Sequence, residues 1–446
     1  MQHITVVGGG ITGLTAAYLA AKAGQKVTVL EGSGQFGGLL NTFEIGGNRL
    51  EYYYHHFFTH DVELKWLICE LKLEDKLQFH ATTMGVFRDG KIYDFNTLFD
   101  LLRFRPISWL GKIRFGLTSL YLGKVARWEK YESVPCQKWY YRFAGKNVTD
   151  ALWKPLLDIK FGPYADRVPL AWMVGRLHQR MSSRKKGEER LGYIDGSLQV
   201  LLDALLIELR NLGVELVANA AVTRLEITRQ KLVAVKTPQG RMASDRFLVT
   251  IPLVYLRDLL HEVPELAHHA NAINYFGAVC TILELDRPLS HVYWLNVSDP
   301  GFPFGGIIEH TNLIPAEEYQ GTHIVYLSSY FAMEEDLAQI GENEIAERMV
   351  APLGKIYPGF QREWIKNIHV FRTYTAATVC DLEFSKKVPP CKTSLENLYL
   401  ANMAHIYPDE RSANNAIRVA AEACKVMGIP ASQVPYGASL SGKIGF

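Results

Sequence analysis

Three glycines near the start of the chain, spaced Gly8-x-Gly10-x-x-Gly13, are the residues whose types and spacing most clearly indicate a binding function. An apolar, β-branched run (4–7) precedes them and an alanine- and leucine-rich segment follows. In a strand–turn–helix unit the first glycine permits the tight turn, the second lets a pyrophosphate approach the backbone, and the third lets helix and strand pack closely. The free N–H groups at the start of the helix favour phosphate. This pattern predicts a dinucleotide-binding site.

A carboxylate and a second glycine pair follow at suitable distances. Residues 26–30 are predicted to be a buried strand, and Glu31 lies 18 residues after Gly13, about where an acid should accept hydrogen bonds from a ribose. Gly37 and Gly38 would bring a further stretch of backbone to the same ligand. The alternative is a βαβ unit without a ligand, in which Glu31 is a solvated acid at a strand end.

Residues 51–61, EYYYHHFFTHD, form the most unusual local sequence. A histidine here, with a pKa near neutrality, could orient a substrate or move a proton, and we select His56 as the catalytic candidate. Tyr54 is a candidate substrate contact. The alternative is an aromatic wall with satisfied histidines. We expect no metal site, because adjacent histidines point in different directions and no shell rich in carboxylates is evident.

Two basic regions are further candidates. Arg176, Arg180 and Arg184 recur at helical spacing near the stretch 153–162, so one helix face could bind a diphosphate or carboxylate. Residues 101–130 contain seven Lys or Arg and one Glu among apolar residues, which is typical of helices at an anionic membrane surface. For both regions the alternative is a solvated helix face. Two further candidates for the substrate pocket are Arg372 and Tyr374.

The composition of the chain narrows the classes of protein to which it can belong. A chain of 446 residues with 48% hydrophobic residues is expected to form two or three globular domains. The 48 basic and 46 acidic residues leave a net charge of +2, so no global field favours nucleic acid. Six cysteines without a CxxC pair indicate a reducing compartment. No apolar run could span a bilayer, and the first strand leaves no room for a signal peptide, so we expect a cytoplasmic protein, peripheral at a membrane if 101–130 bind one.

The elements that must position these residues can be read from hydrophobic periodicity. We expect strands at 214–217, 222–227, 232–237, 246–251 and 397–402, and helices at 197–212 and 413–427, the second with Ser412 as its N-cap. A hairpin is predicted at 85–93 around Asp89-Gly90, and residues 97–190 are mostly helical. Further strands are expected at 278–285, 291–297, 304–310, 323–331 and 364–374, with a helix at 334–353. The end of the chain, 428–446, is expected on the surface or loose.

Residues 8–42, GGGITGLTAAYLAAKAGQKVTVLEGSGQFGGLLNT, resemble the amino-terminal fingerprint of the FAD-binding family that includes amine oxidases, protoporphyrinogen oxidases and phytoene desaturases. A weaker resemblance, through HHFFTHD, is to UDP-galactopyranose mutase, whose flavin-adjacent histidine would be His56. The resemblance implies FAD, bound without a covalent link because no cysteine lies at a tethering motif. The residues it places at the cofactor are Gly8, Gly10, Ile11, Thr12, Gly13, Glu31, Gly32, Gly37, Gly38, Leu39, Val222, Asn402 and Ser412. Asn402-Met403 replaces the Gly-Asp that the family usually has.

The resemblance also implies an α/β fold with a Rossmann-like (GR2-type) FAD-binding domain, built from residues 1–80, 191–265 and 390–430. Residues 81–190 and 266–389 would form an α+β substrate domain with a mostly antiparallel sheet and a helical insertion, and 431–446 a tail. The expected function is an FAD-dependent oxidoreductase that passes a hydride from a small or lipid-like substrate to flavin N5. One alternative is a non-redox flavoenzyme acting on a sugar nucleotide, and another is a non-catalytic FAD-binding protein. The sequence does not identify the substrate or the oligomeric state.

Overall fold

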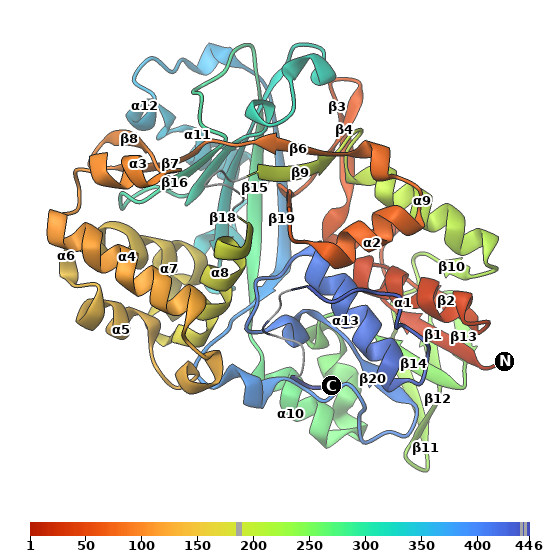
Figure 1. The fold of residues 1–446 in the computed structure, drawn as a ribbon. Helices are drawn as coiled ribbons and strands as arrows, with labels where there is room; N and C mark the ends of the chain where they lie inside the picture. Colours follow the sequence, from red (N-terminus) through yellow and green to blue (C-terminus); the bar gives the residue numbers. More distant parts are fainter. Residues whose placement is uncertain (184–189, 438–439, 441–443) are drawn as a thin grey trace.

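The computed structural model describes residues 1–183, 190–437, 440 and 444–446. The described residues contain two large sheets (Figure 1). One lies beside the amino terminus, and short chain segments separate it from the other. Among the described residues, no helix combines the length and the apolar character needed to cross a membrane. Arg184, the third residue of the predicted basic helix face, lies outside the described residues.

The first sheet is parallel, with the strand order β10–β2–β1–β14–β20. Its strands are short and mostly buried, as in sheets covered on both faces: β1 (His3–Val7), β2 (Lys26–Leu30), β10 (Glu215–Val217), β14 (Arg246–Val249) and β20 (Leu398–Leu400). The helices that share a core with β1 and β2 are α1 (Ile11–Lys22), α2 (Val62–Glu70), α9 (Leu198–Asn211) and α13 (Ala413–Val426). Segments far apart in sequence therefore end at one sheet edge.

The other face of this sheet packs on a small antiparallel sheet and a helical segment. Their elements are β11 (Arg224–Thr228), β12 (Lys231–Thr237), β13 (Gly240–Ala243) and α10 (Pro264–Ala272). Apolar side chains of β11 and β12 lie in one cluster with Val7 and Leu30. The expected paired strands at 222–227 and 232–237 are confirmed to within two residues.

The second sheet has the order β19–β15–β18–β17–β16–β7–β8. Its pairings are antiparallel except for β16 with β7. The strands are β7 (Met84–Arg88), β8 (Lys91–Asp94), β15 (Tyr275–Leu285), β16 (Trp294–Val297), β17 (Gly306–Glu309), β18 (His323–Phe331) and β19 (Ile365–Thr378). Positive φ angles at Asp89 (52°) and Gly90 (70°) confirm the tight hairpin predicted there, since a type I′ turn needs both.

A helical layer packs beside this sheet (Figure 1). It consists of α3 (Leu98–Arg103), α4 (Trp109–Lys124), α5 (Cys136–Phe143), α6 (Lys146–Val148), α7 (Lys154–Phe161) and α8 (Leu170–Ser183). Thr97 and Asp100 form a capping box at α3, and Ser108 caps α4. The helical character expected for 97–190 is confirmed for the described residues.

Short elements connect the two sheets. They are the hairpin β3 (Thr42–Ile45) and β4 (Asn48–Glu51), the helix α2 (Val62–Glu70), and the strands β5 (Phe57–Phe58), β6 (Leu77–Ala81) and β9 (Arg190–Ile194). β9 pairs with both β5 and β6. The chain from β4 to β5, which contains the histidine-rich segment, therefore runs between the two sheets.

One expectation was wrong and another holds only in part. The single helix predicted for 334–353 is interrupted: α11 spans Glu342–Val350, with Gly341 as its N-cap, and α12 begins at Leu353 after Pro352, which cannot donate a helix hydrogen bond. Much of the described C-terminal tail lies along the surface, as expected, but it is also anchored in the core. Val434 is buried in the core of the parallel sheet, and the Phe446 ring lies 5.2 Å from that of His405.

Candidate functional site

The glycine turn lies at the carboxyl end of β1. Gly8 has a φ of +113°, and a Cβ there would lie 2.5 Å from the Thr250 hydroxyl oxygen. A Cβ at Gly13 would lie 1.9 Å from the carbonyl oxygen of Gly8. Thr250, at the end of β14, donates its hydroxyl to the carbonyls of Val7 (3.1 Å) and Gly8 (3.2 Å). These contacts require glycine at 8 and 13 for the fold itself.

Gly10 is different, because a Cβ there would meet no atom within 4 Å. It is the N-cap of α1, and no side chain caps the helix. The first N–H groups of an α-helix have no partner within the helix, so those of Ile11 and Thr12 can bind an anion in the space beside Gly10. The room at Gly10 and the uncapped helix fit the pyrophosphate of a dinucleotide.

The second glycine pair packs directly against the first. The Gly37 N–H donates to the Gly9 carbonyl at 2.8 Å, and Gly10 and Gly37 form an isolated parallel bridge. Gly38 has a φ of +59°, and a Cβ there would lie 3.3 Å from the Gly10 Cα. Leu39 follows in a short 3-10 turn and is half-buried. Two backbone segments without side chains thus face one another at the edge of the sheet.

Glu31 lies beside both segments. One carboxylate oxygen accepts the Gly9 N–H and the other accepts the Ser33 N–H, each at 2.8 Å. A carboxylate oxygen can accept two hydrogen bonds, so each retains capacity for a ribose hydroxyl. The neighbouring chain is close: the Ala220 N–H donates to the Glu31 carbonyl at 2.7 Å, and a Cβ at Gly32 would lie 3.5 Å from that of Ala221. Val222, which comes directly after Ala221 in the chain, is half-buried.

The segment EYYYHHFFTHD crosses one face of the second sheet. The ring of Tyr52 stacks on Phe371 with centroids 4.3 Å apart, and the Tyr326 hydroxyl donates to the Glu51 carbonyl at 2.8 Å. The Glu51 carboxylate is buried and accepts the Tyr193 hydroxyl and the Leu198 N–H. These contacts fix the segment at its start.

Tyr54 and His56 both contact Trp294. The Tyr54 ring meets the indole edge-on at 4.8 Å, and the His56 ring does so at 5.7 Å. His55 instead donates Nδ1–H to the Tyr53 carbonyl at 2.5 Å, and His60 stacks on Phe58 at 5.4 Å. The structure therefore brings Tyr54 and His56 together.

The His56 ring is not a proton carrier near neutral pH. Burial lowers the pKa of His56 to about 3, and the positive charge of Arg180 contributes. The expectation of a pKa near neutrality was wrong, because it took no account of burial between the two sheets. A neutral imidazole keeps one N–H donor and one acceptor. His56 can therefore orient a bound group by hydrogen bonding.

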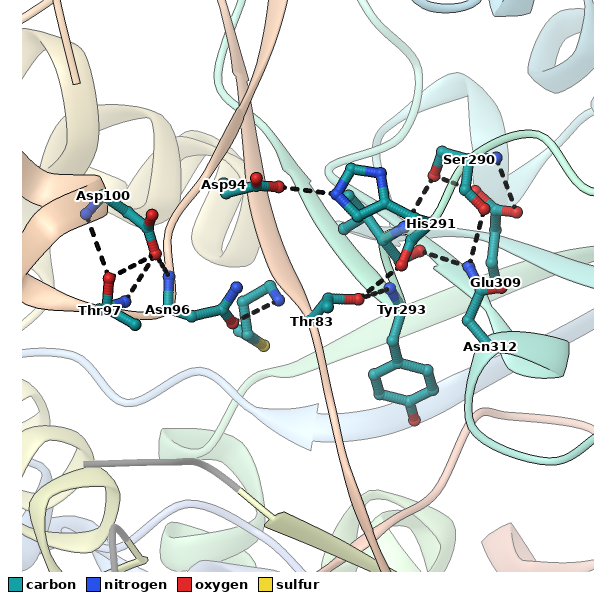
Figure 2. A network of polar contacts seen from close by, with 12 residues as sticks. Thr83, Asp94, Asn96, Thr97, Asp100, Ser290, His291, Tyr293, Glu309 and Asn312 are labelled. Carbon is teal, nitrogen blue, oxygen red and sulfur yellow. Dashed lines mark hydrogen bonds and ion pairs between the residues drawn. The ribbon is translucent and has the colours of Figure 1, made fainter. Parts of the chain in front are cut away.

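Tyr293 is the polar partner of His56, with its hydroxyl 3.3 Å from His56 Nδ1. Figure 2 shows how the backbone that carries Tyr293 is fixed: its N–H donates to the Thr83 hydroxyl at 3.0 Å, and Thr83 donates to the His291 carbonyl at 2.6 Å. Asn312 donates to the carbonyl of Ser290, and Glu309 accepts the Ser290 N–H and hydroxyl. Sequence reasoning missed Tyr293, and no local motif surrounds it.

Cationic side chains lie next to this group. Arg176 of α8 is buried and forms an ion pair with Glu410, and the Lys160 ammonium of α7 lies 3.6 Å from the same carboxylate. Arg180, one turn after Arg176, is close enough for its charge to lower the pKa values of His56 and Lys160. Arg411 donates to the Tyr330 hydroxyl at 2.6 Å. Glu410, Arg411 and Tyr330 were not among the sequence candidates, because only the tertiary fold brings them here.

Two candidates point elsewhere. In β19, Phe371 faces Tyr52, so the next residue, Arg372, projects from the opposite face of the sheet. There it donates to the carbonyls of Leu337 (3.1 Å) and Ile340 (2.8 Å), and the Tyr374 ring lies beside it. Arg372 and Tyr374 therefore lie on the face of β19 opposite to Tyr52, and their role as substrate contacts stays a prediction. The sequence identified the strand but not which face is which.

At the carboxyl end of β20, Asn402 is buried and its side chain is used within the protein. It accepts the Ala404 N–H at 3.1 Å and donates to the Ile251 carbonyl at 3.4 Å. Ser412 is the N-cap of α13, as expected, and accepts the Asn415 N–H at 3.1 Å. Asn414 on this helix accepts the Leu64 N–H at 3.0 Å, so the start of α13 lies near the histidine-rich segment. Among the described residues no group of His, Cys, Asp and Glu side chains is arranged to hold a metal ion.

Known proteins resemble this chain in sequence and in fold. The model of the family "Flavin containing amine oxidoreductase" matches residues 11–425, and the chain belongs to this family of oxidoreductases. A curated relative, the chloroplastic/chromoplastic 15-cis-phytoene desaturase of an Oncidium hybrid cultivar, is 22% identical over 439 residues, covering 90% of this chain and 73% of the relative.

Solved structures share the fold. An oxidoreductase from Methanosarcina mazei superposes with a TM-score of 0.75 at 17% identity, covering 96% of this chain and 100% of the other. Reduced UDP-galactopyranose mutase gives a TM-score of 0.73 at 12% identity, covering 100% of this chain and 98% of the other. At these identities the likeness concerns the fold alone.

Proposed function

We propose that this member of the flavin-containing amine oxidoreductase family binds FAD without a covalent link and oxidises a small or lipid-like organic substrate. The observation that carries the proposal is the contact between the two glycine segments at the end of β1, beside the Glu31 carboxylate. This contact leaves open space at Gly10 and an uncapped helix end facing it. A dinucleotide pyrophosphate has the charge and the size for that space.

In this proposal the cofactor residues divide by the part of FAD they hold. Gly8, Gly10, Ile11, Thr12 and Gly13 hold the pyrophosphate, and Gly37, Gly38 and Leu39 lie along the ribityl chain. Glu31 and Gly32 bind the adenosine ribose, and Val222 contacts adenine. The N-terminus of α13, capped by Ser412, carries the positive end of the helix dipole and has no acidic residue in its first turn, so it favours negative charge on the flavin ring. Asn402 acts indirectly, by shaping the end of β20 through its own hydrogen bonds.

We also propose a division into domains that follows the chain. Residues 1–80, 191–265 and 390–430 form the FAD-binding part, in a Rossmann-like (GR2-type) arrangement. Residues 81–190 and 266–389 form the substrate part, and 431–446 close the chain. The five strands of the parallel sheet all lie in the first set of segments, and the seven strands of the second sheet lie in the other set, which supports the division.

When bound, the flavin supplies the chemistry of accepting a hydride from a C–H bond. The chain's own residues position the substrate and limit water. The rings of Phe58, Tyr293 and Trp294 surround His56, and the neutral imidazole offers a hydrogen bond for orientation. Tyr293 holds that imidazole from its Nδ1 side. A substrate C–H bond held in one orientation reacts faster, because its positional entropy has already been lost on binding.

Anaerobic absorbance measurements test the proposed reaction. The FAD-loaded protein is mixed without oxygen with amines, polyenes and cyclic substrates that can lose two hydrogens. Bleaching of the flavin band by one of these, with recovery in air, is the expected result. If none of the oxidisable substrates bleached the flavin band, the proposal that the protein oxidises its substrate would be contradicted.

A mutase-like reaction on a sugar nucleotide is a second candidate, favoured by the cations beside His56. It predicts turnover of a sugar nucleotide only after the flavin has been reduced, with no net redox change. A non-catalytic FAD-binding protein is the third candidate, and it predicts that neither assay gives turnover.

We further propose peripheral contact with an anionic membrane through residues 101–130 and the adjoining turn of α3. Large apolar side chains on α3 and α4 project into solvent: Phe99 is 71% exposed, Trp109 65% and Leu117 63%. Basic residues alternate with them along α4. Solvated helix faces rarely expose so many apolar side chains, whereas interfacial helices combine these two residue classes.

Vesicle sedimentation tests this contact. The protein is expected to sediment with vesicles containing phosphatidylglycerol and less with phosphatidylcholine alone. Trp109→Glu and Leu117→Glu should each weaken binding about tenfold, since each removes one exposed apolar side chain that would be buried in the membrane. Ile207→Glu is the matched control, because Ile207 is 55% exposed on α9, on the other side of the molecule (Figure 1). Equal binding by all variants would contradict the proposed contact.

A further inference from the structure

The chain segment 289–293 leads into β16 and fixes the backbone of two rings that meet His56. The Tyr293 hydroxyl lies 3.3 Å from His56 Nδ1, and the Tyr293 side chain is buried. Trp294, the first residue of β16, meets the His56 ring edge-on with centroids 5.7 Å apart. The surroundings of His56 therefore depend on how this short segment is held.

The Glu309 carboxylate, at the end of β17, holds the segment (Figure 2). One carboxylate oxygen accepts the N–H groups of Leu289 at 3.0 Å and Ser290 at 3.1 Å, and the other accepts the Ser290 hydroxyl. The Glu309 N–H donates to the Tyr293 carbonyl at 2.9 Å. Glu309 therefore binds both the start of the segment and the residue that contacts His56.

Uncharged groups complete the attachment of the segment. The Thr83 carbonyl accepts the Trp294 N–H at 3.1 Å and shares the Tyr293 N–H with the Thr83 hydroxyl. Asn312 donates to two carbonyls of the segment, each at 3.1 Å. Neither Thr83 nor Asn312 can change its charge with pH, so these contacts hold the segment in the same way across the neutral range.

Glu309 is the buried carboxyl group among the described side chains that hold the segment. A second carboxylate, Asp94, contacts His291 of the segment at 2.9 Å, but these side chains lie on the surface, 51% and 67% exposed. Burial raises the pKa of Glu309 to about 7, although its three hydrogen bonds and the charge of His291 oppose this. Among the described residues, the titratable side chains that interact with the Glu309 charge are His291 and Tyr357. Glu309 therefore changes charge near neutral pH.

Protonation of Glu309 rearranges its hydrogen bonds. The ionised carboxylate accepts all three donors, whereas a protonated carboxyl group is itself a donor at one oxygen. The Ser290 hydroxyl, which donates to Glu309, also accepts the Val292 N–H at 3.1 Å. A change at Ser290 is therefore passed to the residue directly before Tyr293.

We infer that Glu309 is a positioning residue for His56: its ionised carboxylate holds the segment so that Tyr293 and Trp294 keep the imidazole in one orientation. The inference rests on the proposed function, because His56 orients a substrate only if the flavin lies beside it. Loss of the Glu309 charge loosens the contact between Tyr293 and His56 and slows the reaction. The rate then depends on pH through Glu309, although His56 itself stays neutral.

Nitrogen NMR of the FAD-loaded protein with labelled histidine tests this link directly, with the His56 Nδ1 resonance assigned by His56→Asn. Glu309→Gln should shift this resonance, because the carboxamide keeps the size of the side chain but removes its charge. Asp299→Asn is the matched control and should leave it unchanged: Asp299 follows the other end of β16 and accepts the N–H groups of Asp89 and Gly90, each at 2.9 Å. The same His56 resonance in Glu309→Gln and the parent would overturn the inference.

A milder substitution keeps the result independent of folding. Ser290→Ala removes the hydroxyl that donates to Glu309 and leaves the carboxylate and both N–H donors in place. It should shift the His56 resonance in the same direction as Glu309→Gln, by a smaller amount. A folded Ser290→Ala protein with an unshifted resonance would also overturn the inference, since the link runs through this segment.

The pH dependence of the same resonance gives a separate check. In the parent it should move with a midpoint at about pH 7 as Glu309 ionises, although burial keeps the pKa of His56 itself at about 3. Glu309→Gln should lose this movement. The other ionisable groups near His56 are present in both proteins: His55, Lys160, Arg180 and Tyr330. Identical titration curves in the two proteins would contradict a role for Glu309.

Turnover in two backgrounds shows whether Glu309 acts through Tyr293. At about pH 8, where the parent carboxylate is ionised, Glu309→Gln alone should lower kcat about three- to tenfold and change KM less than about twofold. In the Tyr293→Phe background it should lower kcat by less than about twofold, since the hydroxyl that contacts His56 is already absent. Equal factors in the two backgrounds would overturn the inference.

The two kinds of measurement separate this inference from the proposed function. A protein that oxidises a substrate, but whose His56 resonance does not respond to Glu309→Gln, would refute the inference and leave the proposed function standing. A protein that oxidises no substrate, but whose His56 resonance does respond, would refute the proposed function and support the link from Glu309 to His56.

Discussion

Replacing Gly10 by alanine separates the needs of the fold from those of the cofactor. Gly10 has φ −76° and ψ 175°, angles that alanine readily adopts, and a Cβ there would meet no atom within 4 Å. Gly341 is a close match, since it is also a helix N-cap, has φ −74° and ψ 162°, and offers the same free space. Both variants should therefore change the free energy of unfolding of the apoprotein by less than about 1 kcal/mol.

The effects on FAD should differ sharply. An alanine methyl group at position 10 occupies the space in which the pyrophosphate would approach the N–H groups of Ile11 and Thr12. Losing one such hydrogen bond to a charged group costs about 1.5–3 kcal/mol. This corresponds to an increase in Kd of about ten- to a hundredfold. Gly341→Ala lies far from the glycine turn in sequence and leaves that space unchanged.

The assay is a titration of the deflavinated proteins with FAD, followed by quenching of flavin fluorescence, together with thermal unfolding of the same samples. We expect Gly10→Ala to bind FAD weakly while unfolding like Gly341→Ala. Equal FAD affinity in the two variants would refute the placement of the pyrophosphate at Gly10. The placement would also be refuted if Gly10→Ala lost its affinity for FAD only because the variant unfolds.

Three other substitutions test neighbouring parts of the account. Gly13→Ala should destabilise the fold by about 3 kcal/mol or more, because its Cβ would lie 1.9 Å from the Gly8 carbonyl oxygen, and denaturant unfolding would measure this. Tyr293→Phe removes the hydroxyl 3.3 Å from His56 and should slow turnover about three- to tenfold. The unfolding free energy of this variant should stay within about 1.5 kcal/mol of the parent. An unchanged rate would exclude a role of Tyr293 in orienting His56. Burial raises the pKa of Glu309 to about 7, so the folded state binds this proton more tightly and the unfolding free energy should fall as the pH rises from about 4.5 to 7. Glu309→Gln should make the fall of the unfolding free energy with pH shallower, and chemical unfolding at several pH values would measure this. An unchanged dependence on pH would contradict the role given to Glu309.

The features that sequence could predict are those fixed by neighbours in the chain. Within one βαβ unit, the φ of +113° favours glycine at position 8, and the closeness of the Gly8 carbonyl requires glycine at position 13. The hairpin at Asp89-Gly90 depends on two backbone angles. The strand expected at 323–331 is observed with the same bounds, because its β-branched and aromatic residues favour a buried strand.

The features that sequence could not predict depend on which surfaces meet. His56 and Tyr293 are 237 positions apart, and their contact follows from the anchoring of the chain at Thr83 and Glu309. Burial between the sheets determines the pKa of His56, and no local sequence reports it. Arg372 lies in a strand that was predicted, but a period-two pattern does not say which face meets the histidine-rich segment. The packed tail at Val434 and Phe446 is likewise a tertiary feature.

The cationic side chains beside His56 show the same division. The stretch containing Lys160 and the helical spacing of Arg176 and Arg180 were visible in the sequence. Their convergence with Arg411 and Tyr330 was not, because these residues come from a loop and a strand far along the chain. Solvated helix faces and binding sites have similar sequence patterns, and only the position of the face relative to the rest of the fold separates them.

The central claim, that the two glycine segments and Glu31 hold one FAD without a covalent bond, is tested most directly by acid precipitation of the purified protein. The released flavin is identified by chromatography and mass and quantified against the chain. The account predicts one FAD per chain, all of it in the supernatant. Flavin that stays with the precipitate, a flavin other than FAD, or a colourless protein that takes up no FAD would contradict it.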